Sequence, residues 1–154
     1  MSHLDLRYGN NPHQGRARLE LPASGSPDSG PPLRVLNGAP GYINILDALT
    51  AWPLVQELSA VTGKVAAASF KHLSPAGAAV EGPVSEAFGT AQFLGDVPES
   101  AVARAYVRAR GADRMSSYGD TVAVSETVDV ELAQILRREV SDQIIAPAYE
   151  PEAL

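Results

Sequence analysis

The stretch KVAAASF, residues 64–70, constrains the fold more than any other part of the sequence, because it is short, apolar and rich in small residues. A run of this kind without polar and apolar alternation is typical of a strand buried on both faces of a mostly parallel sheet. Such a strand needs a covering layer on each side. The run therefore predicts a strand of which both faces are covered.

Segments with helical spacing alternate with two further apolar runs. Apolar residues three or four positions apart predict helices, and short β-branched or apolar runs predict strands. The predicted helices are 43–63, 98–111 and 129–140, and the further strands are 121–126 and 143–150. Strands that alternate with helices imply an α/β layered domain.

Individual residues predict where these elements begin, bend or end. Pro53 lies inside the first helical pattern and predicts a kink or a restart there, because proline removes a backbone hydrogen bond. Pro98 suits the first turn of the second helix and Gly111 its end. Asp129 is a plausible N-cap of the third. Segment 81–97 has weak periodicity and predicts a loop with a short helix.

Three segments lie outside this alternation. Residues 21–32, LPASGSPDSGPP, predict an exposed Pro/Gly/Ser loop. Residues 33–38, LRVLNG, alternate and end in Asn-Gly, which predicts a strand closed by a tight turn. At the C-terminus, Pro151 and Glu152 resemble the opening turn of another helix, so we expect the chain to be a piece of a longer protein.

Composition excludes several classes of function. The formal net charge of −6 argues against a nucleic-acid or anionic-membrane binder, because such partners attract a surplus of Lys and Arg. The sequence has no cysteine, which excludes disulfides, thiolate nucleophiles and the usual structural zinc sites. Three scattered histidines predict no metal site. Neither a signal peptide nor a membrane span is evident, so we expect a cytoplasmic protein.

Polar residues that flank the predicted strands are the candidates for chemistry, because ligands of open α/β sheets bind beyond the carboxyl ends of strands. They are Lys71, His72, Ser74 and Gly77 after the first run, residues 110–120 before the second, Asp142 before the third, and Arg7, Tyr8 and His13 near the N-terminus. Each also has an ordinary structural explanation. A Lys-His pair at a strand end is commonly solvated, Asp142 suits a turn, and RARGADR suits an exposed helix face.

Five blocks in one order give the sequence a family resemblance: LRYGNNPHQ, VLNGAPGYINILDALTAW, AAASFKHLSPAGAAV, YVRARGADRMSSYGD and REVSDQIIAPAYE. The chain resembles the transformylase part of the AICAR formyltransferase/IMP cyclohydrolase family, particularly its animal-type form. The resemblance implies a three-layer α/β/α subdomain similar in fold to cytidine deaminase, without catalytic zinc. It covers nearly the whole chain, as the first of two such subdomains.

The resemblance also implies an activity and the residues that carry it. The reaction is formyl transfer from the co-substrate 10-formyltetrahydrofolate to the 5-amino group of the AICAR nucleotide. By position, His72 matches the proton acceptor and Lys71 the cation that stabilises the transition state. Matching nucleotide-binding positions are Arg7, Tyr8, His72, Gly119, Asp142 and Asn44, and Met115 and Tyr118 match the folate side.

The same family implies a homodimer in the cytosol, without a metal, a nucleic acid or a membrane as partner. It also implies that the IMP cyclohydrolase domain and the second transformylase subdomain are absent from these 154 residues. Because the active site of the family is shared between subunits, we expect the isolated chain to be inactive. The alternative is a non-catalytic module, derived from that enzyme, that binds the nucleotide or dimerises.

Overall fold

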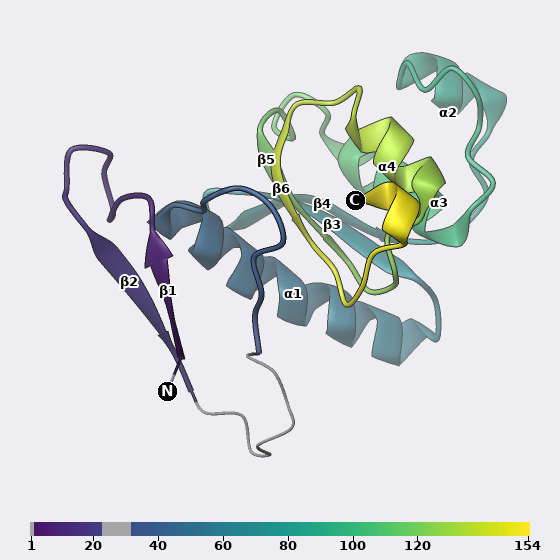
Figure 1. Cartoon of the computed structure of the whole chain (residues 1–154). Helices are drawn as coiled ribbons and strands as arrows, with labels where there is room; N and C mark the ends of the chain where they lie inside the picture. The colour runs from purple at the N-terminus through teal and green to yellow at the C-terminus, as the bar shows by residue number, and fades with distance from the viewer. Residues whose placement is uncertain (1, 23–31) are drawn as a thin grey trace. The chain divides into compact units, whose positions relative to one another are not determined.

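The computed structural model describes residues 2–22 and 32–154, and the chain divides into two compact units. The first unit, which extends to Ile45, contains the antiparallel strands β1 (Ser2–Leu6) and β2 (Ala17–Leu21) (Figure 1). Leu21 was expected in the exposed loop 21–32, but it is buried at the end of β2, and residues 23–31 lie outside the described residues.

The expected strand at 33–38 is wrong. These residues are irregular, and both Val35 and Leu36 are exposed, so the alternating pattern does not correspond to a buried face. The turn residue of the pattern keeps its role, because Gly38 has a φ of 80°, which favours glycine.

Helix α1 (Tyr42–Thr62) continues through Pro53 as one helix, so the expected restart is wrong. Proline removes the hydrogen bond that the carbonyl group of Leu49 would accept. Both Leu49 and Pro53 are exposed, so water can solvate that carbonyl group. The opposite face of α1 buries Ala51 and Val55.

The second unit, from Leu46 to the end of the chain, is built on a four-stranded sheet in the order β4-β3-β5-β6. The strands are β3 (Ala66–Lys71), β4 (Ser74–Val80), β5 (Asp120–Val124) and β6 (Ser141–Ile145). β3 runs antiparallel to both β4 and β5, and only β5 and β6 are parallel. The expected α/β class is confirmed, but the mostly parallel sheet is wrong, because β4 returns directly from β3 through a hairpin instead of a helical crossover.

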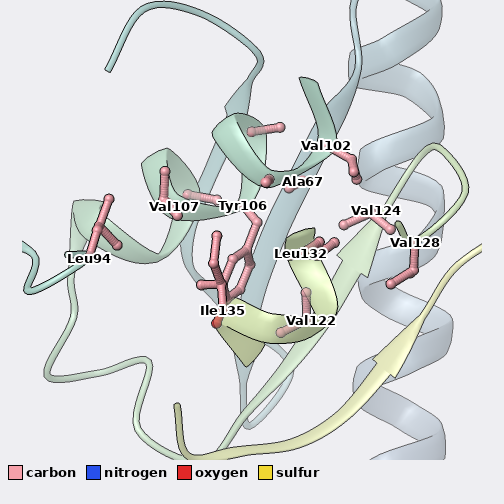
Figure 2. Packing of buried hydrophobic residues seen from close by; sticks show 13 residues of the cluster. Ala67, Leu94, Val102, Tyr106, Val107, Val122, Val124, Val128, Leu132 and Ile135 are labelled. Atoms are coloured by element: carbon pink, nitrogen blue, oxygen red, sulfur yellow. The ribbon is translucent and has the colours of Figure 1, made fainter. Parts of the chain in front are cut away.

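The buried strands of this sheet present alternate residues to two layers of helices. Ala66, Ala68 and Phe70 pack against α1, whereas Ala67, Val122 and Val124 pack against α3 (Ala101–Ala112) and α4 (Val130–Leu136). Figure 2 shows Tyr106, Leu132 and Ile135 in the second of these cores. The unit therefore has three layers, as the resemblance implied.

Polar caps, rather than the expected proline and glycine, set the limits of α3. Ser100 accepts a hydrogen bond from the Ala103 N–H, so Pro98 lies before the helix. Gly111 lies inside α3, where a Cβ atom would come within 2.5 Å of the Phe88 ring of α2 (Glu86–Ala91). Close packing, and not helix termination, accounts for this glycine. The short helix α2 confirms the expectation for 81–97.

Capping also connects α4 to its neighbours. Asp129 accepts a hydrogen bond from the Leu132 N–H and is the expected N-cap. The Glu131 carboxylate accepts hydrogen bonds from the N–H groups of Glu99 and Ser100, ahead of α3. Burial raises the pKa of Glu131, but these bonds outweigh it and hold the pKa below its usual value. The chain ends in a short 3-10 helix, η1 (Pro151–Ala153).

Candidate functional site

The Lys71–His72 pair lies at a two-residue hairpin turn between β3 and β4. Lys71 pairs with Ser74 across the hairpin, so His72 and Leu73 are the two central residues of the turn. Their φ angles are 51° and 67°, positive at both positions as in a type I′ turn. Such turns favour Asn-Gly, and each L residue with a side chain pays about 1–2 kcal/mol in this region. Strained backbone of this kind is enriched at functional sites.

The turn presents the imidazole of His72 to solvent. His72 is exposed, and no described residue forms a hydrogen bond with its side chain. The backbone beneath it is fixed, because the N–H of Leu73 donates to Oδ1 of the buried Asp47 at 2.6 Å. The imidazole is therefore available to a ligand while its main chain is held.

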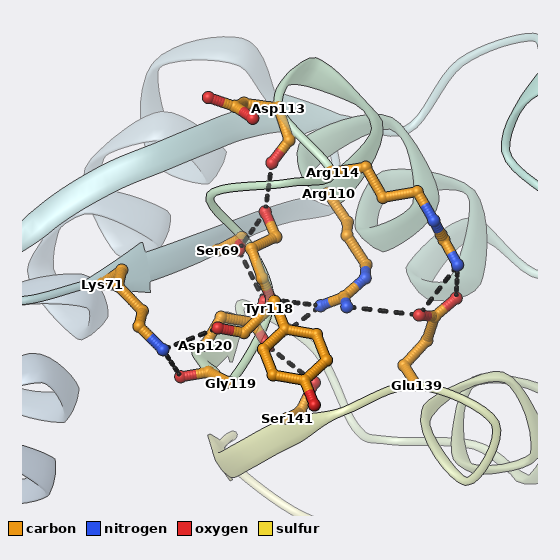
Figure 3. A network of polar contacts seen from close by, with 11 residues as sticks. Ser69, Lys71, Arg110, Asp113, Arg114, Tyr118, Gly119, Asp120, Glu139 and Ser141 are labelled. Atoms are coloured by element: carbon orange, nitrogen blue, oxygen red, sulfur yellow. Dashed lines mark hydrogen bonds and ion pairs between the residues drawn. The ribbon is translucent and has the colours of Figure 1, made fainter.

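The Lys71 ammonium group is held by two backbone carbonyl groups. Its Nζ donates to the carbonyl oxygens of Tyr118 at 2.6 Å and Gly119 at 2.9 Å, which Figure 3 shows as two adjacent contacts. No described carboxylate forms an ion pair with Lys71. Since an ammonium group has three donors and both partners are neutral, one N–H and the full positive charge remain for a ligand.

Gly119 lies between Lys71 and Asp142. A Cβ atom at Gly119 would come within 2.8 Å of the Lys71 Nζ and 3.5 Å of Oδ1 of Asp142. The φ angle of Gly119 is 69°, so glycine suits this position for both its conformation and its size. The structure thus brings Lys71, Gly119 and Asp142, expected from separate parts of the sequence, together at one end of the sheet, and His72 follows Lys71 in the turn.

A buried ionic network lies next to Lys71 and Gly119 (Figure 3). The Arg110 guanidinium group contacts Asp120 at 3.1 Å and Glu139 at 3.2 Å, and it donates to the Ser117 carbonyl oxygen at 2.7 Å. Asp120 also accepts hydrogen bonds from the hydroxyl groups of Ser69 and Ser141. The network thereby fixes residues on both sides of the two carbonyl groups that hold Lys71.

Sequence reasoning did not identify this network. RARGADR was given an exposed helix face as its ordinary explanation, but Arg110 is only 4% exposed and Asp120 is fully buried. A usable signal was present, since Arg110 follows the buried residues Tyr106 and Val107 at helical spacing. Burial raises the pKa of the neighbouring Tyr106 phenol, which therefore stays neutral at physiological pH.

The first unit holds the remaining nucleotide-binding candidates. The Arg7 guanidinium group lies 4.9 Å from the centre of the Tyr8 ring and donates to its hydroxyl group at 3.2 Å. A Cβ atom at Gly41 would come within 3.1 Å of the Tyr8 ring. Oδ1 of Asn44 accepts the Gly41 N–H at 2.8 Å, a bond that caps the start of α1. Arg7, Tyr8 and Asn44 thus form a second group, which belongs to the first unit.

The two residues expected on the folate side are highly exposed. Met115 is 88% and Tyr118 65% exposed, and both precede Gly119 in the same segment. The Tyr118 carbonyl group binds Lys71, so its main chain belongs to the cluster even though its side chain faces solvent. Surface hollows lie beside α4 and along β4, and none of the residues matched to the family's catalytic, nucleotide or folate positions lines either of them.

The cluster offers acid–base and electrostatic chemistry. An exposed imidazole can accept a proton, and an ammonium group without a carboxylate partner can stabilise developing negative charge. Within the described part of the chain, no group of three or more His, Cys, Asp or Glu side chains is placed to hold a metal ion. Nor is any described helix long and apolar enough to span a bilayer.

Comparison with known proteins agrees with the resemblance seen in the sequence. The AICARFT/IMPCHase bienzyme family matches residues 1–154. Bifunctional purine biosynthesis proteins PurH of Deinococcus deserti and Myxococcus xanthus are each 34% identical to the chain, over 150 and 151 residues. PurH of Deinococcus radiodurans is 33% identical over 150 residues. Each match covers 97% of this chain but only 26%, 25% and 26% of the respective relative, so the chain spans about a quarter of their length.

Proposed function

The chain belongs to the AICARFT/IMPCHase bienzyme family, and we propose that it supplies the first subdomain of the transformylase. The proposed reaction transfers the formyl group of 10-formyltetrahydrofolate to the 5-amino group of the AICAR nucleotide. The longer enzyme to which this subdomain belongs would also carry IMP cyclohydrolase activity, act as a homodimer and work in the cytosol. The observation that carries the proposal is the Lys71 ammonium group, held by two carbonyl groups without a carboxylate partner, in the residue next to the exposed His72.

His72 is the proposed base. The amine of the nucleotide is a weak nucleophile, because its lone pair is delocalised into the ring and the carboxamide. As its nitrogen attacks the formyl carbon, the imidazole accepts the proton that the amine loses. The bond from the formyl carbon to the folate nitrogen then breaks, and the imidazolium returns its proton to that nitrogen as it leaves. His72, exposed on a fixed turn, can be approached by both substrates.

Lys71 is the proposed electrostatic stabiliser. Attack on the formyl group places negative charge on its oxygen, which a nearby cation stabilises. Two neutral carbonyl groups orient the ammonium group without cancelling its charge, and its third N–H can point at the oxyanion. A carboxylate partner in the same place would have weakened this effect.

The other proposed roles concern binding. Arg7 suits the phosphate of the nucleotide through its charge and its planar set of donors, and Tyr8 and Asn44 accompany it. Gly119 lets a ligand approach the main chain, and the Asp142 carboxylate, which no described residue binds, accepts hydrogen bonds from the nucleotide. Met115 and Tyr118 are proposed to face the folate.

Titration of the chain with the AICAR nucleotide by calorimetry tests the proposal. We expect binding that Arg7→Ala and Lys71→Ala weaken and that Lys64→Ala, an exposed lysine just before β3, leaves unchanged. Subsequent addition of 10-formyltetrahydrofolate should give no turnover, because the chain covers only a quarter of its relatives. A chain that binds no nucleotide would contradict the proposal.

The role of His72 requires a protein in which this chain is joined to the rest of the bienzyme. His72→Ala should there reduce transfer by about 10²–10⁴-fold, the usual contribution of a general base, with nucleotide binding largely kept. Undiminished turnover would exclude His72 as the base. A second candidate function is a module that binds the nucleotide without catalysis, and the small share of its relatives' length that the chain covers favours it. This candidate predicts nucleotide binding by the chain both alone and joined to the rest of the bienzyme. It also predicts that His72→Ala leaves the turnover of the joined protein unchanged.

A further inference from the structure

The N–H group of Leu73 has no partner in the hairpin itself. In a two-residue hairpin loop, the residues on either side of the turn pair with each other, here Lys71 and Ser74. The N–H groups of the two central residues then need acceptors from elsewhere. For Leu73 this acceptor is Oδ1 of Asp47, which belongs to α1 and lies 26 positions earlier in the sequence.

Asp47 is an unusual residue at its position in α1. It is 5% exposed and shares its face of the helix with the buried Ala51, four residues later. A buried carboxylate needs compensation, from a cation or from hydrogen-bond donors. No described Lys, Arg or His forms an ion pair with Asp47, so the amide of Leu73 is the partner that the structure supplies.

The bond acts on the part of the turn that is conformationally disfavoured. Both His72 and Leu73 have positive φ angles, and neither is glycine or asparagine. A hydrogen bond to a charged acceptor is stronger than one between neutral groups, and at 2.6 Å this one is short. It therefore opposes relaxation of the turn to a conformation in which the main chain of His72 would point elsewhere.

We propose that Asp47 is a positioning residue, which sets the direction of the His72 imidazole by holding the Leu73 amide. The inference rests on the proposed function only in giving His72 a chemical task. The link from Asp47 through Leu73 to the turn does not depend on the identity of the substrate. On the other side of His72, the carbonyl groups of Tyr118 and Gly119 hold Lys71 in a comparable way.

Nuclear magnetic resonance on the chain tests this link without any ligand. The variants are Asp47→Ala, Asp47→Asn and, as a control on the same helix, the exposed Glu57→Ala. We expect Asp47→Ala to accelerate amide exchange at position 73 by about tenfold relative to the amides of β3, since a charge-assisted bond is lost. The Hε1–Cε1 signal of His72 should shift, whereas the signals of His3 and His13 should not.

A rescue experiment separates positioning from general stabilisation. Leu73→Gly removes the preference against a positive φ, and the Leu73 side chain is 43% exposed, so its loss opens no core. Added to Asp47→Ala, it should return the His72 signal toward its original position. A residue that merely stabilised α1 would not be rescued by a change in the turn.

An unchanged His72 signal in Asp47→Ala, or a shift that Leu73→Gly does not reverse, overturns the inference. If Asp47→Ala does not fold, Asp47→Asn replaces it, because the amide keeps an acceptor oxygen but no charge, and it should accelerate exchange at position 73 by about threefold. A chain that shows these effects but binds no AICAR nucleotide would contradict the proposed function and leave the role of Asp47 standing.

Discussion

Arg110→Met should strongly destabilise the second unit. Arg110 is 4% exposed and is the only described cation in contact with Asp120, which is fully buried. Methionine has a similar length but can neither neutralise Asp120 nor donate to the Ser117 carbonyl oxygen. Glu139 is affected less, because it also contacts Arg114 at 2.8 Å.

The magnitude follows from what is left behind. After the substitution, Asp120 keeps the hydroxyl groups of Ser69 and Ser141 as donors but has no cation. Removing one partner of a buried ion pair typically costs about 3–5 kcal/mol. A natural domain is stable by about 5–15 kcal/mol, so the variant should fold but lose much of its stability. Arg114→Met is the matched control, since Arg114 is partly exposed and its loss should cost at most about 1 kcal/mol.

Urea unfolding followed by the fluorescence of Trp52 measures the difference. Trp52 is the single tryptophan and packs against the core between α1 and the sheet. With a slope of about 1.5–2 kcal/mol per molar urea, the midpoint should fall by about 2 M for Arg110→Met and by about 0.5 M or less for Arg114→Met. Equal midpoints for the two variants would refute the argument that burial makes the Arg110–Asp120 pair indispensable.

Three further predictions concern other parts of the second unit. Gly77→Ala should lower the free energy of unfolding by about 2 kcal/mol or more, because the new Cβ would lie 2.1 Å from the Ala109 carbonyl oxygen of α3; a urea midpoint equal to that of the unaltered chain would contradict this packing. Gly119→Ala should cost about 1–2 kcal/mol in the same assay, owing to its positive φ, and should weaken nucleotide binding by displacing the Lys71 ammonium group; unweakened binding would contradict the second effect. Glu131→Gln should reduce the loss of stability on acidification. Burial raises the pKa of Glu131, but backbone hydrogen bonds lower this pKa by more. The stability that the Glu131 carboxylate contributes is therefore present above its unfolded pKa and is lost as the pH falls through its folded pKa. Acid unfolding of the two chains, followed by circular dichroism, would contradict this role if the two curves coincided.

The order and type of most elements could be predicted from local sequence. Apolar runs gave β3, β5 and β6, and helical spacing gave α1, α3 and α4, because burial of one face or two leaves a local periodic pattern. β4 was not predicted, because SPAGAAV contains proline and glycine and lacks the β-branched residues that favour strands. The predicted parallel direction of β3 was also wrong, because the turn His72–Leu73 lacks the Asn-Gly signal of a tight hairpin.

The candidate site, too, could be predicted from the sequence only in part. The polar residues at the strand ends were found because their positions in the chain are informative, and the structure places Lys71, Gly119 and Asp142 together. The buried contacts that support them were missed. Asp47 and Arg110 are charged residues on faces where the pattern predicts either apolar residues or solvent, and only the folded chain shows which partners compensate them.

The hairpin at His72 also bears on attempts to make the protein more robust. Asn-Gly in place of His72–Leu73 should raise its melting temperature, because asparagine and glycine adopt positive φ angles with little strain. That change would remove the imidazole. Design methods that rank substitutions by stability alone would therefore select against the proposed chemistry at this turn, and a stabilised but inert Asn-Gly variant would mark the turn as a place where activity and stability compete.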